Sequence, residues 1–303
     1  MKYLSFRTRT GHESVGALVG DRIMDVGSRL PVETAGLSPI RRLLLAHDGR
    51  LPTSPDDLLG LPGFPREEIE LLPVVPDPTK IVAAPVNYFD HKAEMNEDAH
   101  IDALGVFLKA PSSVIAIGET VRLPYTDRRF DQEGELAFVI GRTARDVAVS
   151  DVADYIAGYT CLLDMTMRGG EDRSTRKSFD TFTPVGPHLV TPDEVGPLDR
   201  LRLQTWVNGD LRQDADISDL IWGVPALLAY ATSVMTLHPG DIVTTGTPAG
   251  VGQVEDGDTI AVEITRVGRL EASVSSKDAV ECPTRGANRG PKPPAEVTAV
   301  RAR

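Results

Sequence analysis

The sequence is poor in cysteine and lacks any long apolar run. Its 303 residues include only Cys161 and Cys282, which lie far apart and show no spacing typical of a zinc site or a redox pair. This excludes a disulfide framework and favours a reducing compartment. No 18 consecutive residues are apolar, and the N-terminus lacks the apolar core of a secretion signal. We therefore expect a cytoplasmic protein without a membrane partner.

Positive charge is also in deficit. The chain carries 32 Lys and Arg residues against 44 Asp and Glu residues, which gives a formal net charge of -12. Because binding to nucleic acid depends on a basic surface, no nucleic-acid partner is expected. Solubility alone explains much of the acidity, but a metal site built from carboxylates would add to it.

Glycine and proline, by contrast, are frequent, with 27 and 23 residues. Their number predicts many turns and short elements and argues against a bundle of long helices. The length fits one large domain, or a large domain with a small one. A chain of this size buries enough surface to fold without disulfides or a structural metal.

Residues 1–78 are predicted to form a small N-terminal α/β domain. Apolar and polar residues alternate on both sides of Gly20-Asp21, which indicates a hairpin. Short helices are expected at 40–46 and 56–61. A stretch with three prolines in nine residues follows at 71–79 and is typical of a connector.

Residues 79–275 are predicted to form a large domain of the α+β class, mainly β. Helices are expected at 149–155 and 224–235. A disordered tail is expected at 276–303, because this segment has almost no large apolar side chains. The short apolar runs that predict a mostly antiparallel sandwich or barrel lie at 81–84, 136–140, 162–163, 203–207, 242–245 and 259–264.

Two glutamates precede one of these runs at a spacing of two. On a strand, Glu133 and Glu135 point to the same face, where two like charges are costly unless a cation lies between them. Oxygen ligands suit Mg²⁺, Mn²⁺ or Ca²⁺. A solvated strand face is the alternative. Asp164 follows an apolar run and is either a third ligand or the N-cap of a helix.

His91 and Glu94 are spaced to meet on one helical turn. A carboxylate on one ring nitrogen fixes the tautomer and raises the basicity of the other nitrogen, as activation of water requires. The alternative is a His–Glu pair on the surface.

Lys177 and Lys109 follow apolar or turn-rich stretches. Either lysine holds a substrate anion, or it is a solvated surface residue. A glycine-rich loop at 245–252 brings backbone N–H groups close to an anion, but it lacks the ending of a nucleotide-binding P-loop.

Together these motifs make the chain resemble the fumarylacetoacetate hydrolase family, in its smaller branch related to acylpyruvate hydrolases. The ordered set covers nearly two thirds of the chain, so no single motif carries the resemblance. The matching stretches lie at 87–94, 107–113, 133–141, 158–160, 164–168, 177–180, 207–213 and 235–252.

The resemblance implies a mixed β-sandwich roll, a homodimer, and a role in aromatic catabolism. It implies that Glu133, Glu135 and Asp164 hold Mg²⁺, or alternatively Mn²⁺ or Ca²⁺. His91 and Glu94 match the family's water-activating dyad. The lysine that supports the oxyanion corresponds to Lys177, while the positions that match substrate contacts are Arg168, Thr247 and Lys109.

Three departures from the family pattern concern the substrate. Glu171 stands where glutamine is common, so one substrate contact changes sign or is lost. The stretch from Asp164 to Lys177 is short and lacks an expected tryptophan, and His188 follows Gly186-Pro187 where tryptophan is frequent. These changes leave the acyl group of the substrate open.

The expected activity is hydrolysis of a carbon–carbon bond in a 2,4-dioxo acid, which yields pyruvate and a carboxylic acid. Decarboxylation of an oxaloacetate-type acid, or isomerisation of a dioxo acid, uses the same enolate chemistry without added water. A keto-acid binding protein without turnover is a third possibility, although such a protein has no need for the dyad and Lys177.

Overall fold

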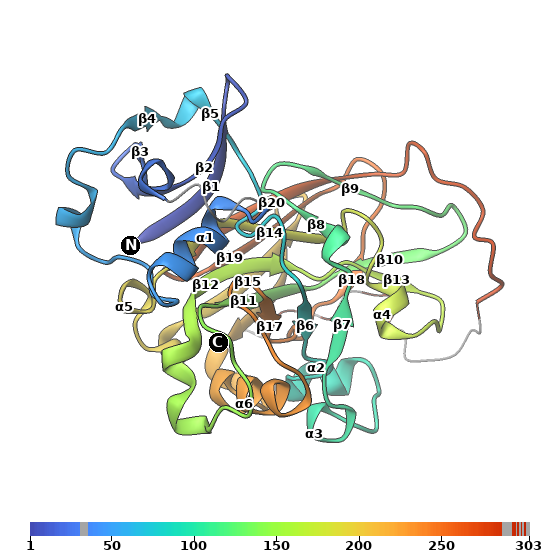
Figure 1. The fold of residues 1–303 in the computed structure, drawn as a ribbon. Coiled ribbons are helices and arrows are strands. Elements are labelled where there is room, and N and C mark those ends of the chain that lie inside the picture. The colour runs from blue at the N-terminus through green and yellow to red at the C-terminus, as the bar shows by residue number, and fades with distance from the viewer. Residues whose placement is uncertain (31–35, 287–292, 295, 297, 299, 301–303) are drawn as a thin grey trace.

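Twelve strands form the larger of two sheets that pack face to face in the computed structural model (Figure 1). The structure describes residues 1–30, 36–286, 293, 294, 296, 298 and 300. The sheet runs in the order β4-β3-β2-β1-β14-β12-β11-β17-β6-β7, with β5 on β1 and β8 on β14. Its strands are β1 (Lys2–Thr8), β2 (Glu13–Val19), β3 (Arg22–Asp25), β4 (Gly63–Pro65), β5 (Ile69–Leu71), β6 (Ile81–Ala83), β7 (Phe107–Lys109), β8 (Val114–Ile115), β11 (Gly134–Ile140), β12 (Ile156–Leu163), β14 (Thr183–Val190) and β17 (Ile242–Thr244).

The second sheet has five strands in the order β16-β15-β19-β20-β9, and a three-stranded sheet, β13-β10-β18, lies beside the two. The β8–β14, β6–β17 and β9–β20 pairs are parallel and the other pairs antiparallel. The remaining strands are β9 (Thr120–Arg122), β10 (Arg129–Gln132), β13 (Thr166–Arg168), β15 (Arg202–Val207), β16 (Asp210–Asp216), β18 (Gly252–Gln253), β19 (Thr259–Ile264) and β20 (Gly268–Ser275). The predicted α+β, mainly β class is confirmed.

The helices are short. The α-helices are α1 (Pro39–Ala46), α2 (Phe89–Glu94), α3 (Ile101–Leu104), α4 (Arg173–Arg176), α5 (Pro192–Val195) and α6 (Val224–Val234). The 3-10 helices are η1 (Val26–Arg29), η3 (Pro55–Leu58), η4 (Arg66–Glu68), η5 (Pro111–Ser113), η6 (Val149–Tyr155), η7 (Leu198–Arg200) and η8 (Ile217–Asp219). Among the described residues, no helix has the length and apolar composition needed to cross a membrane.

Two of the predicted helices, at 40–46 and 224–235, correspond to α1 and α6. The helix expected at 149–155 is the 3-10 helix η6, which begins without a side-chain cap.

β11 is buried on both faces, and the alternation of its side chains explains how. Leu136 and Phe138 belong to the core shared with the five-stranded sheet. Ala137 and Val139 point the other way, into a second core. Glu135 has the same parity as Ala137, so the strand directs its carboxylate away from the five-stranded sheet.

The second core joins the N-terminal residues to the large domain. It contains Tyr3 of β1 and Leu43 of α1 together with Ala137, Val139 and Leu189. β1 also pairs directly with β14, with Tyr3 opposite Leu189. Residues 1–78 therefore share a sheet and a core with the rest of the chain.

The segment after β20 is partly ordered. Val280 forms a parallel bridge with Tyr125, and the backbone N–H of Cys282 donates to Asp127 (2.9 Å). Residues 276–286 thus differ from the predicted disordered tail, because their backbone groups pair with the loop before β10. The predicted tail also includes residues that lie outside the described part of the chain, namely 287–292, 295, 297, 299 and 301–303.

If residues 1–78 and the large domain share one core, truncation of a buried side chain of α1 should destabilise the whole molecule. Leu43 is fully buried, whereas Leu45 on the same helix is half exposed. We expect Leu43→Ala to lower the free energy of unfolding by about 2–4 kcal/mol in urea, and Leu45→Ala to change it by less than about 0.5 kcal/mol. Fluorescence and circular dichroism should give coincident transitions. A Leu43→Ala protein with a separate early transition and an unchanged main transition would contradict the shared core.

Candidate metal and substrate site

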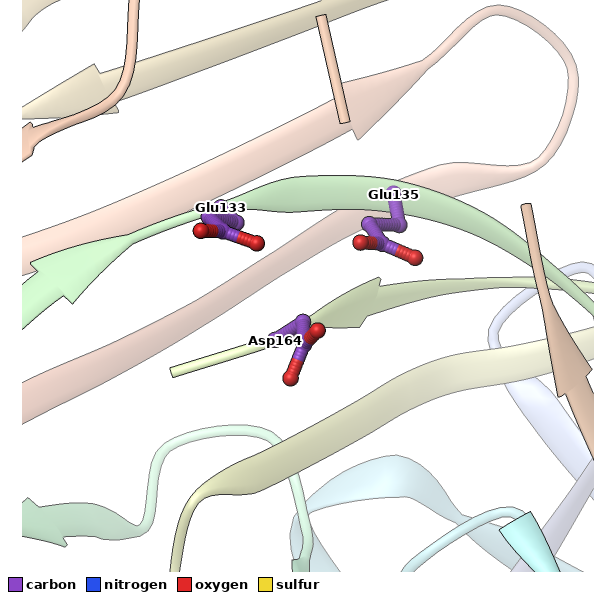
Figure 2. A group of neighbouring side chains, drawn as sticks. All are labelled: Glu133, Glu135 and Asp164. Atoms are coloured by element: carbon purple, nitrogen blue, oxygen red, sulfur yellow. The ribbon is translucent and has the colours of Figure 1, made fainter. Parts of the chain in front are cut away.

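Three carboxylates meet where β11 begins and β12 ends. Glu133 lies between β10 and β11, Glu135 is in β11, and Asp164 directly follows β12. The backbone N–H of Asp164 donates to the Glu133 carbonyl oxygen (2.8 Å), so the two residues lie opposite each other. Figure 2 shows the three side chains turned toward a common space. One ligand oxygen from each carboxylate lies within 4.8 Å of the others.

All three carboxylates are buried, which excludes the solvated strand face considered from the sequence. Asp164 is followed by strand β13, so it does not cap a helix. Buried carboxylates that lie close together need positive charge from elsewhere in the site.

Two buried lysines provide part of that charge. The ammonium group of Lys177 donates to Glu133 (2.7 Å), to Asp164 (2.5 Å) and to the hydroxyl of Thr166 (2.7 Å). Lys109 lies on the other side of Asp164 and donates to its second oxygen. Lys109 and Lys177 therefore hold the two oxygens of Asp164 between them.

Arg168 contributes a third buried cation from β13. Its Nη2 donates to Glu133 (2.9 Å) and its Nε to Asp131 (2.7 Å). Asp131 is also bonded by Arg129 (2.7 Å). The guanidinium of Arg168 thus fixes the carboxylate of Glu133, and two of its N–H groups are already committed within the protein.

The two glutamates differ in their electrostatics. Burial opposes the ionisation of Glu133, but the charges of Lys177 and Arg168 outweigh burial and hold its pKa well below the usual range. Burial and the neighbouring Asp164 raise the pKa of Glu135 to about 8. A carboxyl group whose pKa is raised by burial and by a neighbouring carboxylate indicates that the site lacks positive charge.

The donor set fits a divalent metal. Hard cations such as Mg²⁺ and Mn²⁺ prefer carboxylate oxygens, and a divalent charge would allow Glu135 to ionise beside Asp164. One oxygen of Glu135 accepts from the backbone N–H of Gly246 (2.9 Å) and from the hydroxyl of Thr244. The other oxygen has no donor among the described residues. Glu133, Glu135 and Asp164 are therefore suited to hold the ion.

The predicted dyad forms on helix α2. His91 is buried, and its Nδ1 lies 3.1 Å from Glu94. Glu94 also accepts from the backbone N–H of Gly250 (2.9 Å) and from the hydroxyl of Thr298 (2.5 Å). Burial opposes its ionisation, but these hydrogen bonds, with that from His91, outweigh burial and lower the pKa of Glu94. An ionised Glu94 holds the His91 proton on Nδ1 and leaves Nε2 free to accept another proton.

The glycine-rich loop at 245–252 supports both parts of the site. Gly246 donates to the carboxylate of Glu135, and Gly250 donates to the carboxylate of Glu94. Gly250 has a φ of 101°, and a Cβ built there would lie 1.8 Å from a backbone carbonyl oxygen. A larger residue at this position would displace the loop.

Two supporting residues lay within the sequence motifs but had no predicted role. The amide of Asn87 donates to the carbonyl oxygens of Thr245 (2.8 Å) and Trp222 (2.9 Å) and accepts from the Trp222 N–H (2.7 Å). Gln213 accepts from the Gly134 N–H (2.9 Å) and donates to Thr247 (2.7 Å). No local pattern identifies such partners, because they lie far apart in the sequence.

One narrow cavity collects most of the predicted site residues. It is lined by the three carboxylates, His91, Arg168, Lys177 and Thr247. Lys109 is bonded to Asp164 behind the cavity wall. Glu171 does not line the cavity and accepts from the hydroxyl of Thr284 (3.1 Å). Its contact with substrate stays a prediction from the sequence.

A larger cavity of about 800 Å³ lies against the other side of α2. It is lined by Phe89, Glu94, Arg212, Thr298 and Val300, and it contains none of the three carboxylates. The narrow cavity is the candidate site, because the possible metal ligands, the candidate base and Lys177 lie together only there among the described residues.

Comparisons with known proteins identify a family and several similar chains. The family model described as "Fumarylacetoacetate (FAA) hydrolase C-terminal" matches residues 80–275. A maleylpyruvate hydrolase of Aquipseudomonas alcaligenes is 41% identical over 285 residues, which cover 88% of this chain and 98% of the relative.

Solved structures and other relatives extend the comparison. The crystal structure of maleylpyruvate hydrolase from Sphingobium sp. SYK-6, in complex with manganese(II) and pyruvate, has a TM-score of 0.76 and 38% identity, and covers 91% of this chain and 99% of that one. A bifunctional isomerase/decarboxylase of 4-hydroxyphenylacetate degradation from Salmonella dublin is 36% identical, and covers 79% of this chain and 56% of the relative.

The raised pKa of Glu135 predicts that metal affinity depends on pH. Below about pH 8 the metal-free protein keeps Glu135 protonated, so binding of a cation must release that proton. We expect the affinity for Mn²⁺ to rise roughly tenfold per pH unit from pH 6 and to level off above about pH 8. Isothermal titration in buffers of different ionisation enthalpy measures both affinity and proton release.

Glu135→Gln should bind Mn²⁺ weakly at every pH, because it removes a ligand oxygen and the proton together. Glu263→Gln, on the exposed side of β19, is the matched control and should behave like the unmodified protein. An affinity for Mn²⁺ that stays constant between pH 6 and pH 8, without proton release, would show that Glu135 is not a titrating ligand.

Proposed function

The chain belongs to the fumarylacetoacetate hydrolase family, and on that premise we propose that it hydrolyses a carbon–carbon bond in a 2,4-dioxo acid of the acylpyruvate type. The predictions of this family and of a hydrolase acting on carbon–carbon bonds are confirmed by the comparisons. Maleylpyruvate is the first substrate to test, because it is named in two of the similar proteins. The products would be pyruvate and a carboxylic acid.

A single arrangement supports this proposal most strongly. His91 lines the same narrow cavity as the three carboxylates and Lys177, and Glu94 bonds to its Nδ1 from the other side of α2. The cavity therefore combines a base for water, a place for a divalent ion and a buried cation beside it. Hydrolysis needs all three functions, whereas a binding protein needs no oriented base.

The dyad activates the water. Because Glu94 accepts the Nδ1 proton, His91 Nε2 takes a proton from water, and the water oxygen adds to the distal carbonyl carbon of the substrate. The bond between that carbon and the pyruvate unit then breaks. Its electron pair moves into the pyruvate unit and places negative charge on the 2-oxo oxygen.

Lys177 stabilises the enolate that this step creates. Its three N–H groups are bonded to Glu133, Asp164 and Thr166, so it acts on the enolate through its positive charge, or through an N–H group that one of these partners releases. A divalent cation held by Glu133, Glu135 and Asp164 would supply Lewis-acid polarisation of the 2-oxo acid end of the substrate. The enolate carbon finally takes a proton equivalent to the one that His91 removed from water, which gives pyruvate and restores the neutral base.

We propose Mg²⁺ as the physiological ion, with Mn²⁺ or Ca²⁺ as alternatives that suit the same oxygen donors. A divalent ion is supported by the acidic triad and by the manganese-bound relative. A cytoplasmic location, a homodimer and a division of the chain near residue 78 remain proposals from the sequence.

Removal of the base should stop hydrolysis without removing the metal site. We expect His91→Ala to lower kcat for maleylpyruvate by about 10²–10⁴-fold, because general-base catalysis is lost, while Mn²⁺ affinity stays within about threefold. His12→Ala, an exposed histidine in the turn before β2, is the matched control. Hydrolysis that survives in His91→Ala would remove the dyad from the mechanism.

Parallel assays separate hydrolysis from its alternatives. The ultraviolet absorbance of the dioxo acid is followed while pyruvate and carbon dioxide are measured separately. Hydrolysis releases pyruvate, an isomerase changes the absorbance without pyruvate, and a decarboxylase releases carbon dioxide. No change with any of these acids in the metal-loaded protein would favour the keto-acid binding protein.

A further inference from the structure

Arg176 differs from the other cations that line the narrow cavity. Lys177 and Arg168 are each bonded to two acidic groups or more, and Arg173 pairs with Glu97 (3.4 Å). The guanidinium of Arg176 makes no hydrogen bond or ion pair with any described residue. It nevertheless lines the cavity and is only partly exposed.

A half-buried arginine without a partner carries a desolvation cost that an anionic ligand would offset. Burial and the nearby Arg168 lower the pKa of Arg176 to about 10, so its side chain remains charged at neutral pH. Its planar group offers two parallel N–H donors, which match the two oxygens of a carboxylate. A free, charged guanidinium inside a catalytic cavity is thus suited to bind an anionic part of the substrate.

The charge of the whole cavity leads to the same conclusion. Four acidic side chains, Glu97, Glu133, Glu135 and Asp164, face four basic ones, Arg168, Arg173, Arg176 and Lys177. A divalent ion on the carboxylates would leave two positive charges for a ligand. A dioxo acid with a carboxylate at each end neutralises both charges, whereas an acylpyruvate with an uncharged acyl group neutralises only one.

The local structure separates the two ends of such a ligand. Arg173 and Arg176 are the first and last residues of the single turn of α4, so both side chains lie on one face of it. Lys177, the next residue, turns to the metal carboxylates. One short segment therefore presents one cation to the reacting end of the substrate and a second, free cation to another part of the cavity.

We propose that Arg176 binds the distal carboxylate of a dicarboxylic acylpyruvate and that this contact makes the site selective for acyl groups that end in an acid. The proposal rests on the proposed function for the identity of the substrate. The chemistry that it assigns to Arg176 applies to any 2-oxo diacid that occupies the cavity.

The first test compares two substrates and three variants. For Arg176→Gln, we expect the ratio of kcat/KM for maleylpyruvate to kcat/KM for acetylpyruvate to fall at least about tenfold, as the loss of a charged hydrogen-bonded pair predicts. Arg176→Lys should keep part of the preference, because it keeps the charge. Arg145→Gln, an exposed arginine paired with Asp146, is the matched control and should leave the ratio unchanged. An unchanged ratio in a folded Arg176→Gln protein would overturn the proposal.

A binding experiment tests Arg176 even if neither acylpyruvate is hydrolysed. The Mn²⁺-loaded protein is titrated with 2-oxoadipate and with 2-oxohexanoate, which have the same chain length and differ in the distal carboxylate. The unmodified protein should bind the diacid at least about tenfold more tightly, and Arg176→Gln should lose this difference. If the unmodified protein shows no preference, or if Arg176→Gln retains it, Arg176 is not the carboxylate site.

The two experiments distinguish failure of the proposed function from failure of the role proposed for Arg176. A diacid preference that depends on Arg176, without hydrolysis of either acylpyruvate, would contradict the proposed function and support the role of Arg176. Hydrolysis of both acylpyruvates with a selectivity that does not depend on Arg176 would support the proposed function and overturn the role of Arg176.

Discussion

Three buried carboxylates lie close together, and the organisation of the site follows from the need to balance their charge. Glu133, Glu135 and Asp164 are all buried where β11 begins and β12 ends. Lys177 and Lys109 balance only part of their charge, so Glu135 ionises with difficulty in the absence of a metal. The removal of one partner from such a buried set costs about 3–5 kcal/mol, because it leaves a charge unpaired. Each cation is therefore a structural requirement of the metal site as well as a possible participant in catalysis.

The sheet makes this arrangement possible because it is covered on both faces. β11 sends alternate side chains into two cores, one formed with the five-stranded sheet and one with the N-terminal residues. Such a strand has little freedom to move, so its carboxylates keep their positions. The loop after β17 extends the rigid region to the base, since Gly246 binds Glu135 and Gly250 binds Glu94. One loop thus fixes a metal ligand relative to the group that orients the base.

The parts of this site that could be predicted from the sequence are those governed by local periodicity. The spacing of Glu133 and Glu135 fits a strand, and the spacing of His91 and Glu94 fits a helical turn. Packing between distant segments decides the rest. The N-terminal residues share a core with β11 because α1 and β1 cover its outer face. Glu171 is bonded to Thr284, more than one hundred residues away, and no neighbouring residue indicates this contact.

The difference between local sequence pattern and contacts between distant segments also applies to the arginines of the cavity. The sequence motif identifies Arg168 as a residue near the substrate, but two of its five N–H groups are committed to Asp131 and Glu133. For Arg168 to bind a substrate through those groups, it would have to release a metal ligand, which opposes the chemistry that the metal supports. Arg176 has no such commitment among the described residues. The capacity of an arginine to bind a ligand therefore depends on the bonds that it already makes, which the folded structure shows and the sequence does not.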